Sequence, residues 1–159
     1  MVTLRPMIQH EFADFLTNEI KGYAEWITHA YKLPPERALA TAKEQLSYKY
    51  KDGIDTKNQY IFIVENSNQQ KIGIVAYSIQ IEDQSAWIDV IEIEKAHRQQ
   101  GYGKHVLDLV ETRLKQHDIN HIVLHVYKEN EIAQSLYKKQ GYRVISHIMT
   151  KQLNYTFNE

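Results

Sequence analysis

The sequence of 159 residues contains no cysteine. This absence removes a disulfide framework, a thiolate metal site and a cysteine nucleophile from consideration. The chain also has little net charge, -1 with histidine neutral. Broad electrostatic binding to nucleic acid or to an anionic membrane surface is therefore not expected, and any attraction for anions must be local.

Long apolar runs are missing as well. No stretch approaches the roughly 18 apolar residues of a membrane-spanning helix, and the N-terminus lacks the basic-then-apolar pattern of a secretory signal. We therefore expect a cytoplasmic protein. The length predicts a single domain over residues 1–159, and 43% hydrophobic with 25% charged residues is typical of a soluble globular chain.

The hydrophobic pattern predicts strands and helices in the order β-α-α-β-β-β-α-β-α-β-β. The expected strands cover residues 2–7, 60–65, 72–81, 87–93 and 121–126, with one or two more in 142–153. The expected helices cover an apolar face from Phe12 to Ile27, a second from Leu39 to Tyr50 after Pro34 and Pro35, residues 101–117, and a stretch after Asn130. This order fits an α/β chain, with a mixed sheet and helices on both faces.

The most informative stretch is residues 86–105, where a strand feeds a helix through a turn that holds Gly101 and Gly103. Glycine lets backbone N–H groups turn toward a ligand, and a helix start adds partial positive charge. Arg98 and Lys104 make the turn basic. The pattern predicts a cradle for phosphate or pyrophosphate.

Two common phosphate-binding motifs do not match this turn. A Walker A loop needs a hydroxyl after its lysine and an earlier glycine, but His105 follows Lys104 and that glycine is missing. A dinucleotide fingerprint needs a third glycine, and position 106 is valine. A module that binds ATP or GTP is therefore not expected.

The turn resembles the acetyl-CoA loop of the GNAT N-acetyltransferase family, Gln/Arg-x-x-Gly-x-Gly/Ala after a strand, at Arg98, Gly101 and Gly103. A second block resembles the family further along the chain. There a strand is followed by Asn130, by a helix that carries Ala133 and Tyr137, and by a Gly-Tyr pair. Two matching blocks in the right order identify the chain as similar to GNAT enzymes.

The resemblance implies the GNAT acyl-CoA N-acyltransferase fold, a central mixed sheet with a V-shaped splay between residues 87–93 and 121–126. Acetyl-CoA would enter this opening, and an amine would attack its thioester directly in a ternary complex. The lack of cysteine removes the usual route to an acyl-enzyme intermediate. The other reading is a non-catalytic acyl-CoA sensor, and an intact Tyr137 argues against it.

The resemblance also implies which residues meet acetyl-CoA. The backbone of Ile91 and Ile93 would bond the pantetheine arm like a strand, and one of these N–H groups would stabilise the thioester oxygen as charge develops on it. Further contacts are expected from Arg98, Gln99, Gln100, Gly101, Tyr102, Gly103, Lys104, Asn130, Ala133 and Tyr137. Helical spacing places the last three on one face, with Ile132 and Leu136 toward the core.

Tyr137 is the predicted general acid. A leaving thiolate has a pKa near 8.5 and a free phenol near 10, so the proton moves uphill by about 2 kcal/mol, a small cost for a positioned group. The alternative reading of Tyr137 is packing against the cofactor.

For the base we rank Glu92 first, Asp89 second and His125 third, with ordered water as the alternative to all of them. A regular strand would put Asp89 on the same sheet face as Trp87, and a β-bulge would change which residues share that face.

The acceptor is expected to be a small-molecule or peptide amine, and the sequence does not choose among amino acids, antibiotics, polyamines and protein N-termini. Tyr23, Trp26 and Tyr31 lie in the helix that shapes the acceptor pocket in the resembled fold, although they also fit ordinary helix packing. No metal is expected. The resemblance is compatible with a homodimer.

Overall fold

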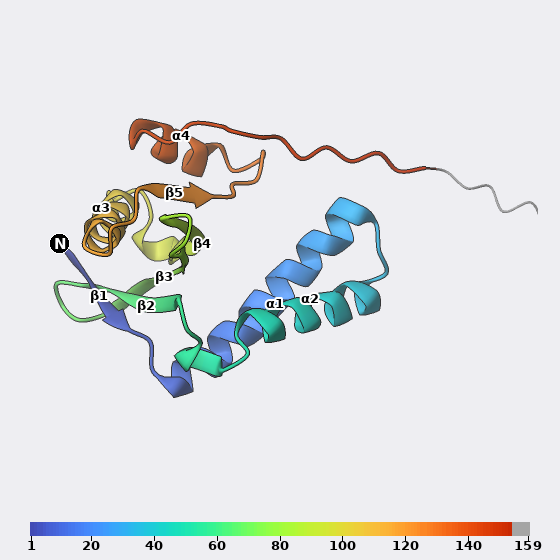
Figure 1. Cartoon of the computed structure of the whole chain (residues 1–159), viewed down its shortest axis with the longest axis horizontal. Coiled ribbons are helices and arrows are strands. Elements are labelled where there is room, and N and C mark those ends of the chain that lie inside the picture. Colours follow the sequence, from blue (N-terminus) through green and yellow to red (C-terminus); the bar gives the residue numbers. More distant parts are fainter. Residues whose placement is uncertain (154–159) are drawn as a thin grey trace, which may run out of the picture. The chain divides into compact units, whose positions relative to one another are not determined.

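The computed structural model describes residues 1–153. Its strands are β1 (Val2–Pro6), β2 (Gln59–Asn66), β3 (Lys71–Gln80), β4 (Ser85–Ile93) and β5 (His121–Leu124). Its α-helices are α1 (Gln9–Tyr31), α2 (Pro35–Lys49), α3 (Tyr102–Lys115) and α4 (Glu131–Lys139), joined by the short 3-10 helices η1 (Gly53–Asp55) and η2 (Lys95–His97) (Figure 1). The predicted elements are confirmed up to α4, with small shifts of their ends.

The chain divides into two compact units, and the prediction of a single domain stays a prediction. The sheet unit is Met1–Gln9 with Asp52–Arg143, and it holds the five strands, α3 and α4. The helical unit is His10–Lys51 together with the chain from Val144 onward. Of the helices within residues 1–153, none is long and apolar enough to cross a membrane.

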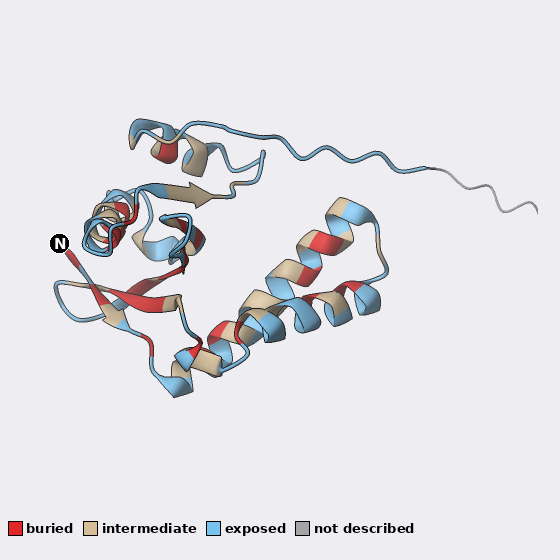
Figure 2. Ribbon diagram, viewed as in Figure 1, coloured by how far each residue is buried: buried red, intermediate tan, exposed pale blue. Residues whose placement is uncertain are grey.

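The sheet is mixed, as predicted. Its strands lie in the order β1-β2-β3-β4-β5, and only the pair of β4 with β5 is parallel. One face packs on the apolar side of α3, where four side chains are almost fully buried: Val106, Leu107, Val110 and Leu114. Figure 2 shows buried segments, in red, both on the strands of the sheet and on α3. The helical repeat of apolar residues after Lys104 creates this contact.

A β-bulge interrupts β4 at Asp89. Val90 pairs with Ala76 of β3, but the next β3 residue, Tyr77, pairs with Ile88, so Asp89 is the extra residue. After a bulge of this kind, each following side chain of the strand lies on the opposite face of the sheet from the one it would take in a regular strand. The bulge therefore decides which β4 side chains share a face.

Pairing between β4 and β5 stops at the same place. The parallel ladder runs from Ser85↔His121 to Ile88↔Leu124, while β4 continues to Ile93. Within residues 1–153, the second half of β4 has β3 as its only paired strand. β5 is thus paired along its whole length, while β4 continues past the end of β5, as expected where two parallel strands splay apart.

In the helical unit, α1 and α2 run side by side (Figure 1). Ala38 and Ala42 of α2 are fully buried in a cluster with Ala24 and Ile27 of α1, and such small residues let two helices approach closely. Leu39, predicted on the apolar stripe of α2, is instead exposed. The buried stripe of α2 is thus built from alanine.

An aromatic cluster lies along α1. The Trp26 ring stacks on Tyr23 at 5.8 Å between centroids and meets Tyr31 edge-on at 5.6 Å. The Tyr23 hydroxyl donates to Gln45 Oε1 of α2 at 2.6 Å. These contacts give the three aromatic residues a packing role inside the helical unit.

The terminal strands predicted for residues 142–153 are wrong, because this stretch has no regular secondary structure. Its apolar side chains are exposed, from 59% for Val144 to 91% for Met149. The alternating pattern favours an extended chain, but a strand forms only when a second strand completes its hydrogen bonds.

Candidate active site

The second half of β4, after pairing with β5 has ended at Ile88, presents backbone groups on the side away from β3. We call it the open half of β4. The Glu94 N–H donates to the Ile72 carbonyl on the β3 side at 2.8 Å. Because N–H directions alternate along a strand, the backbone groups of Ile91 and Ile93 point to the other side, where pairing with β5 has ended. Arg98 Nε donates to the Ile93 carbonyl at 2.7 Å. Arg98 therefore orders the turn that follows β4.

The turn into α3 leaves a helix start without a cap. Gly101 is the N-cap residue, with a φ of 80°, and no described side chain caps this end. The first hydrogen bond of the helix is from the His105 N–H to the Gly101 carbonyl at 3.3 Å. The first N–H groups of a helix have no partner inside it, and they carry the positive end of the helix dipole. This arrangement fits an anionic group such as a pyrophosphate.

The two glycines of this turn have different surroundings. Gly101 has the positive φ that favours glycine, and a Cβ added there would meet nothing within 4 Å. A Cβ on Gly103 would lie 3.0 Å from Leu136 Cδ2 of α4. Gly101 thus leaves open space at the helix start, whereas Gly103 allows α3 and α4 to pack closely.

The charge of Lys104 is partly neutralised on α3 itself. Its Nζ lies 2.7 Å from Asp108 Oδ2, one helical turn later, and both side chains are about half exposed. Pairs at this spacing are common on helix surfaces and stabilise the helix slightly. Because its ammonium group is paired with Asp108, Lys104 adds to the positive charge of the helix start mainly through its backbone N–H.

The second predicted block forms α4 and its approach. Asn130 is the N-cap residue, and its side chain accepts a hydrogen bond from the Ala133 N–H at 3.1 Å. The amide of Gln134 donates to the carbonyls of Tyr127 and Lys128. Asn130 thus fixes where α4 begins, in line with the prediction of a helix that starts at this residue.

The predicted core face of α4 is only partly right. Leu136 packs against the core cluster, as expected, but Ile132 is 72% exposed. The inner face instead carries Ala133 and Tyr137. In the first turn of this short helix, Ile132 lies on the outer side, where the sheet unit offers it no partner.

Tyr137 is the buried side chain of α4, at 8% exposure, and it belongs to the same core cluster as Ile88 of β4. Burial raises the pKa of its phenol above the usual value of 10. Its ring lies 5.7 Å from that of Tyr142. Tyr137 is therefore protonated at neutral pH and packed in the core cluster, although a raised pKa makes donation of the proton harder than from a free phenol.

Tyr142 is a residue that the sequence reasoning did not assign. Its hydroxyl is buried and has no hydrogen-bond partner among the described residues. Burial, then the nearby Glu111 and Tyr137, raises the pKa of this phenol strongly. The Gly-Tyr pair after α4 was the available signal, but it could not show which atoms would surround the ring.

The bulge in β4 decides where its two candidate carboxylates, Asp89 and Glu92, lie relative to the faces of the sheet. Residues opposite each other share a sheet face, and the pairs Trp87↔Ser78, Val90↔Ala76 and Glu92↔Ile74 put Trp87 and Glu92 on one face. Asp89, expected there in a regular strand, is the bulge residue, and both carboxylates are exposed. His125 is exposed too, with its ring 5.1 Å from Tyr127.

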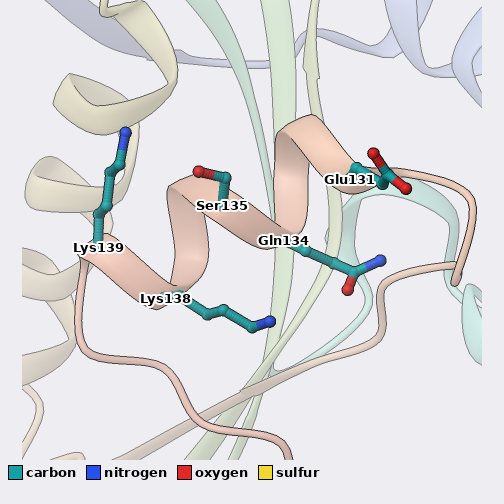
Figure 3. Close-up of a pocket in the computed structure, with 5 residues that line it drawn as sticks. All are labelled: Glu131, Gln134, Ser135, Lys138 and Lys139. Atoms are coloured by element: carbon teal, nitrogen blue, oxygen red, sulfur yellow. The ribbon is translucent and has the colours of Figure 1, made fainter.

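A hollow on the outer side of α4 is lined by Glu131, Gln134, Ser135, Lys138 and Lys139 (Figure 3). None of these residues was predicted to bind a ligand, and Tyr137 is not among them. Within residues 1–153, no group of three or more histidine, cysteine, aspartate or glutamate side chains could hold a metal ion. The predicted site is thus an open strand edge beside a helix start.

Comparison with known proteins places these features in context. The Acetyltransferase (GNAT) family matches residues 20–142. An uncharacterized N-acetyltransferase of Bacillus subtilis, YycN, is 26% identical over 154 residues, covering 96% of this chain and 99% of that protein. The crystal structure of YycN, described as a putative acetyltransferase, has a TM-score of 0.88 at 25% identity, covering 98% of this chain and all of that one.

A more distant likeness concerns the fold alone. Spermidine N-acetyltransferase from Vibrio cholerae, in complex with CoA and spermine, is 22% identical with a TM-score of 0.67. The alignment covers 96% of this chain and 86% of that one.

Proposed function

The chain belongs to the GNAT acetyltransferase family, whose chemistry is acyl transfer, and we propose that it transfers the acetyl group of acetyl-CoA to a primary amine by direct attack in a ternary complex. The observation that carries the proposal is the open half of β4, which runs directly into the uncapped start of α3. A strand edge suits the amide groups of pantetheine, and a helix start suits the pyrophosphate.

The proposed roles in binding are mainly backbone roles. Ile91 and Ile93 bond the pantetheine arm through their peptide groups, and the N–H groups of residues 99–104 surround the pyrophosphate. Arg98 holds the turn in place through its bond to the Ile93 carbonyl. The open space beside Gly101 supports this cradle, because a side chain there would fill the approach to the N–H groups.

The chemistry can be written as a balanced transfer. The amine nitrogen forms a bond to the acetyl carbon, the carbon–sulfur bond breaks, and the sulfur leaves as a thiolate. A backbone N–H of β4 stabilises the oxygen of the tetrahedral intermediate. The thiolate then takes a proton from Tyr137, and the nitrogen loses one to a base.

Tyr137 is proposed as the general acid because it is buried and protonated. Burial raises its pKa, so the transfer to a thiolate costs more than the about 2 kcal/mol expected for a free phenol. The transfer becomes easier only as negative charge builds on the departing sulfur. Tyr137 is thus suited to donate late in the reaction.

The base must remove a proton from the amine, since freeing the lone pair of a protonated amine at neutral pH costs roughly 4–5 kcal/mol. Glu92 remains our first choice, because the bulge puts it on the face of Trp87, beside the peptide groups of Ile91 and Ile93. Asp89 is second and His125 third. A water held by one of these side chains is the alternative.

A thiol-release assay with acetyl-CoA and a panel of amines and peptides tests the proposal. The panel includes amino acids, polyamines, aminoglycosides and peptides with free N-termini. Release that requires one class of amine, with acetylated product confirmed by mass spectrometry, is expected. Calorimetry with acetyl-CoA in parallel separates the alternatives. Binding without release for any amine would favour the acyl-CoA sensor, and absence of binding would overturn both.

A further inference from the structure

Gly73 lies inside β3, paired with Ile93 of β4 on one side and with Val64 of β2 on the other. A glycine within a strand costs conformational entropy and has no side chain to pack, so its presence needs a reason. Gly73 is buried, and it is not among the glycines with a positive φ. Its backbone conformation therefore does not require glycine, and the reason must lie in the space around it.

The space beside Gly73 is taken by the backbone of β4. A Cβ added at this position would overlap the carbonyl oxygen of Glu92, and it would lie 3.2 Å from the carbonyl carbon of that residue and 3.1 Å from Ile93 Cδ1. A side chain can rotate away from such a contact, but a carbonyl group moves only with its strand. The open half of β4 therefore lies closer to β3 than a residue with a side chain at position 73 would allow.

A hydrogen bond holds the same stretch of β4 against β3. The Glu94 N–H donates to the Ile72 carbonyl at 2.8 Å. Ile72 is an extra residue of β3, because the pairing of β3 with β2 shifts by one at this point, and its side chain is fully buried in the core cluster. The open half of β4 is thus held to β3 at Glu92 by a close approach and at Glu94 by a hydrogen bond.

These two contacts fix the direction of the peptide groups in the open half of β4. The backbone groups of neighbouring residues point to opposite sides of a strand. Those of Glu92 and Glu94 point to β3, so those of Ile91 and Ile93 point to the side where pairing with β5 has ended. The place of the Ile91 and Ile93 peptide groups therefore depends on how closely β4 lies against Gly73.

We propose that Gly73 is a positioning residue for acetyl-CoA binding, a role that rests on the acetyl transfer proposed above. Gly73 acts through β4: without a side chain, it keeps the peptide groups of Ile91 and Ile93 where the pantetheine arm can reach them. A methyl group at position 73 would push the open half of β4 away from β3, into the space that pantetheine needs. A displacement on the order of 1 Å can cost roughly a hundredfold where groups must be aligned.

Two ligands separate this role from a general loss of stability. Acetyl-CoA requires both the open half of β4 and the start of α3, whereas 3′-phospho-ADP carries the pyrophosphate without the pantetheine arm. Calorimetry with both ligands is done at a temperature at which circular dichroism shows every variant to be folded. Gly73→Ala should weaken acetyl-CoA binding by roughly tenfold or more, and change the affinity for 3′-phospho-ADP by less than about twofold.

Val64→Ala is the matched control. Val64 is fully buried in β2, next to Gly73 and on the side away from β4. The loss of two methyl groups leaves a cavity and lowers the free energy of unfolding, but it adds no atom between β3 and β4. Val64→Ala should therefore bind both ligands like the natural chain. Urea denaturation compares the stability of the two variants.

Glu94→Pro provides the same test should Gly73→Ala fail to fold. Glu94 has a φ of -56° and follows the last residue of β4, so proline fits the backbone at this position. Proline has no N–H, so it removes the hydrogen bond to the Ile72 carbonyl and with it the second contact that holds β4 to β3. Acetyl-CoA binding should weaken again, with the affinity for 3′-phospho-ADP little changed.

Gly73→Ala with the acetyl-CoA affinity of the natural chain, or with an equal loss for both ligands, would overturn the proposal. The proposed function fails in a different way. A natural chain that binds acetyl-CoA but releases no thiol with any amine would overturn the transfer and leave the binding test of Gly73 in force. A natural chain that binds no acetyl-CoA would overturn both.

Discussion

Helices α3 and α4 of the sheet unit begin in opposite ways. The start of α3 is Gly101, which offers no side chain to its N–H groups, and no described side chain caps them. The start of α4 is Asn130, whose side chain accepts the Ala133 N–H at 3.1 Å. Both turns lie in motifs that resemble the same family. One helix start is thus left open, and the other is closed by its own residue.

The difference between the two helix starts assigns them different roles, one in binding an anion and the other in holding side chains in place. An open helix start can use its N–H groups on an anion, while a capped helix start has used one already. A capped helix holds its side chains in place, and α4 carries the buried Tyr137. We therefore expect changes at the start of α3 to alter binding, changes at Tyr137 to alter turnover, and changes at the cap to alter stability.

The largest effect is expected from Tyr137→Phe, which keeps the ring and removes the proton. Turnover should fall by roughly 10²–10⁴-fold, the usual contribution of a general acid, while acetyl-CoA affinity changes little. Steady-state kinetics and calorimetry measure the two quantities. Unchanged turnover, with the chemical step shown to be rate-limiting, would leave Tyr137 as a packing residue and remove the catalytic half of the comparison.

Glu92→Gln asks whether a second side chain acts in the chemistry. We expect turnover to fall by roughly a hundredfold, the lower end for a general base, and the acidic limb of the pH profile of kcat/KM to flatten or shift. Asp89→Asn and His125→Ala are measured in parallel. An acidic limb that is unchanged in Glu92→Gln but absent in Asp89→Asn or His125→Ala would overturn our ranking. If all three keep it, ordered water becomes the better account.

Gly101→Ala tests the open helix start against a matched change. An alanine at positive φ costs roughly 1–2 kcal/mol of backbone strain. Gly141 provides the control, because it also has a positive φ and open space around its Cβ position. We expect Gly101→Ala to weaken acetyl-CoA binding by roughly tenfold or more, since its methyl group obstructs the N–H groups. Gly141→Ala should be similarly destabilised with little change in affinity. Equal affinities in the two variants would contradict the cradle.

Asn130→Ala addresses the closed helix start. Loss of an N-cap side chain typically costs about 0.5–2 kcal/mol. We expect the free energy of unfolding to fall by about 1 kcal/mol in urea denaturation. Asn130→Asp is the control, because aspartate also caps well. If instead both variants kept full stability and Asn130→Ala bound acetyl-CoA far more weakly, Asn130 would be a ligand contact and the contrast between the two helix starts would be lost.

The smallest effect is expected from Tyr142→Phe at neutral pH. The hydroxyl is buried without a described partner, so its removal should leave stability unchanged or raise it by a few tenths of a kcal/mol. Its raised pKa adds a pH test. The folded state favours the protonated phenol, so this contribution is present below pH 10 and is lost as the pH rises above it. Tyr142→Phe should therefore lose stability less steeply above pH 10, which alkaline denaturation measures.

The sequence predicted the order of elements from β1 to α4 because each follows from local periodicity. It also placed the two family motifs on the turn into α3 and on α4. It could not separate Gly101 from Gly103, because the reason for the second glycine is Leu136 on a different helix. Contacts between distant residues leave no local pattern.

The missed strands and the alternative left open for β4 have the same origin. Alternation marked residues 142–153 as strand-forming, but a strand requires a partner edge, and alternation does not supply one. The phase of β4 depends on where β3 pairs with it, and the bulge at Asp89 appears only in that register. In both cases the local preference was read correctly, and the pairing that completes it lies outside the segment.

The division into two compact units has a practical consequence for spectroscopy. The chain has two tryptophans, and one lies in each unit. Trp26 is stacked on Tyr23 in the helical unit, and Trp87 is 44% exposed on β4, one residue before pairing with β5 ends. Replacing either one by phenylalanine leaves a single intrinsic fluorophore. Emission from Trp26 would then follow the melting of the helical unit, and emission from Trp87 would follow the sheet unit and any ligand that enters beside it.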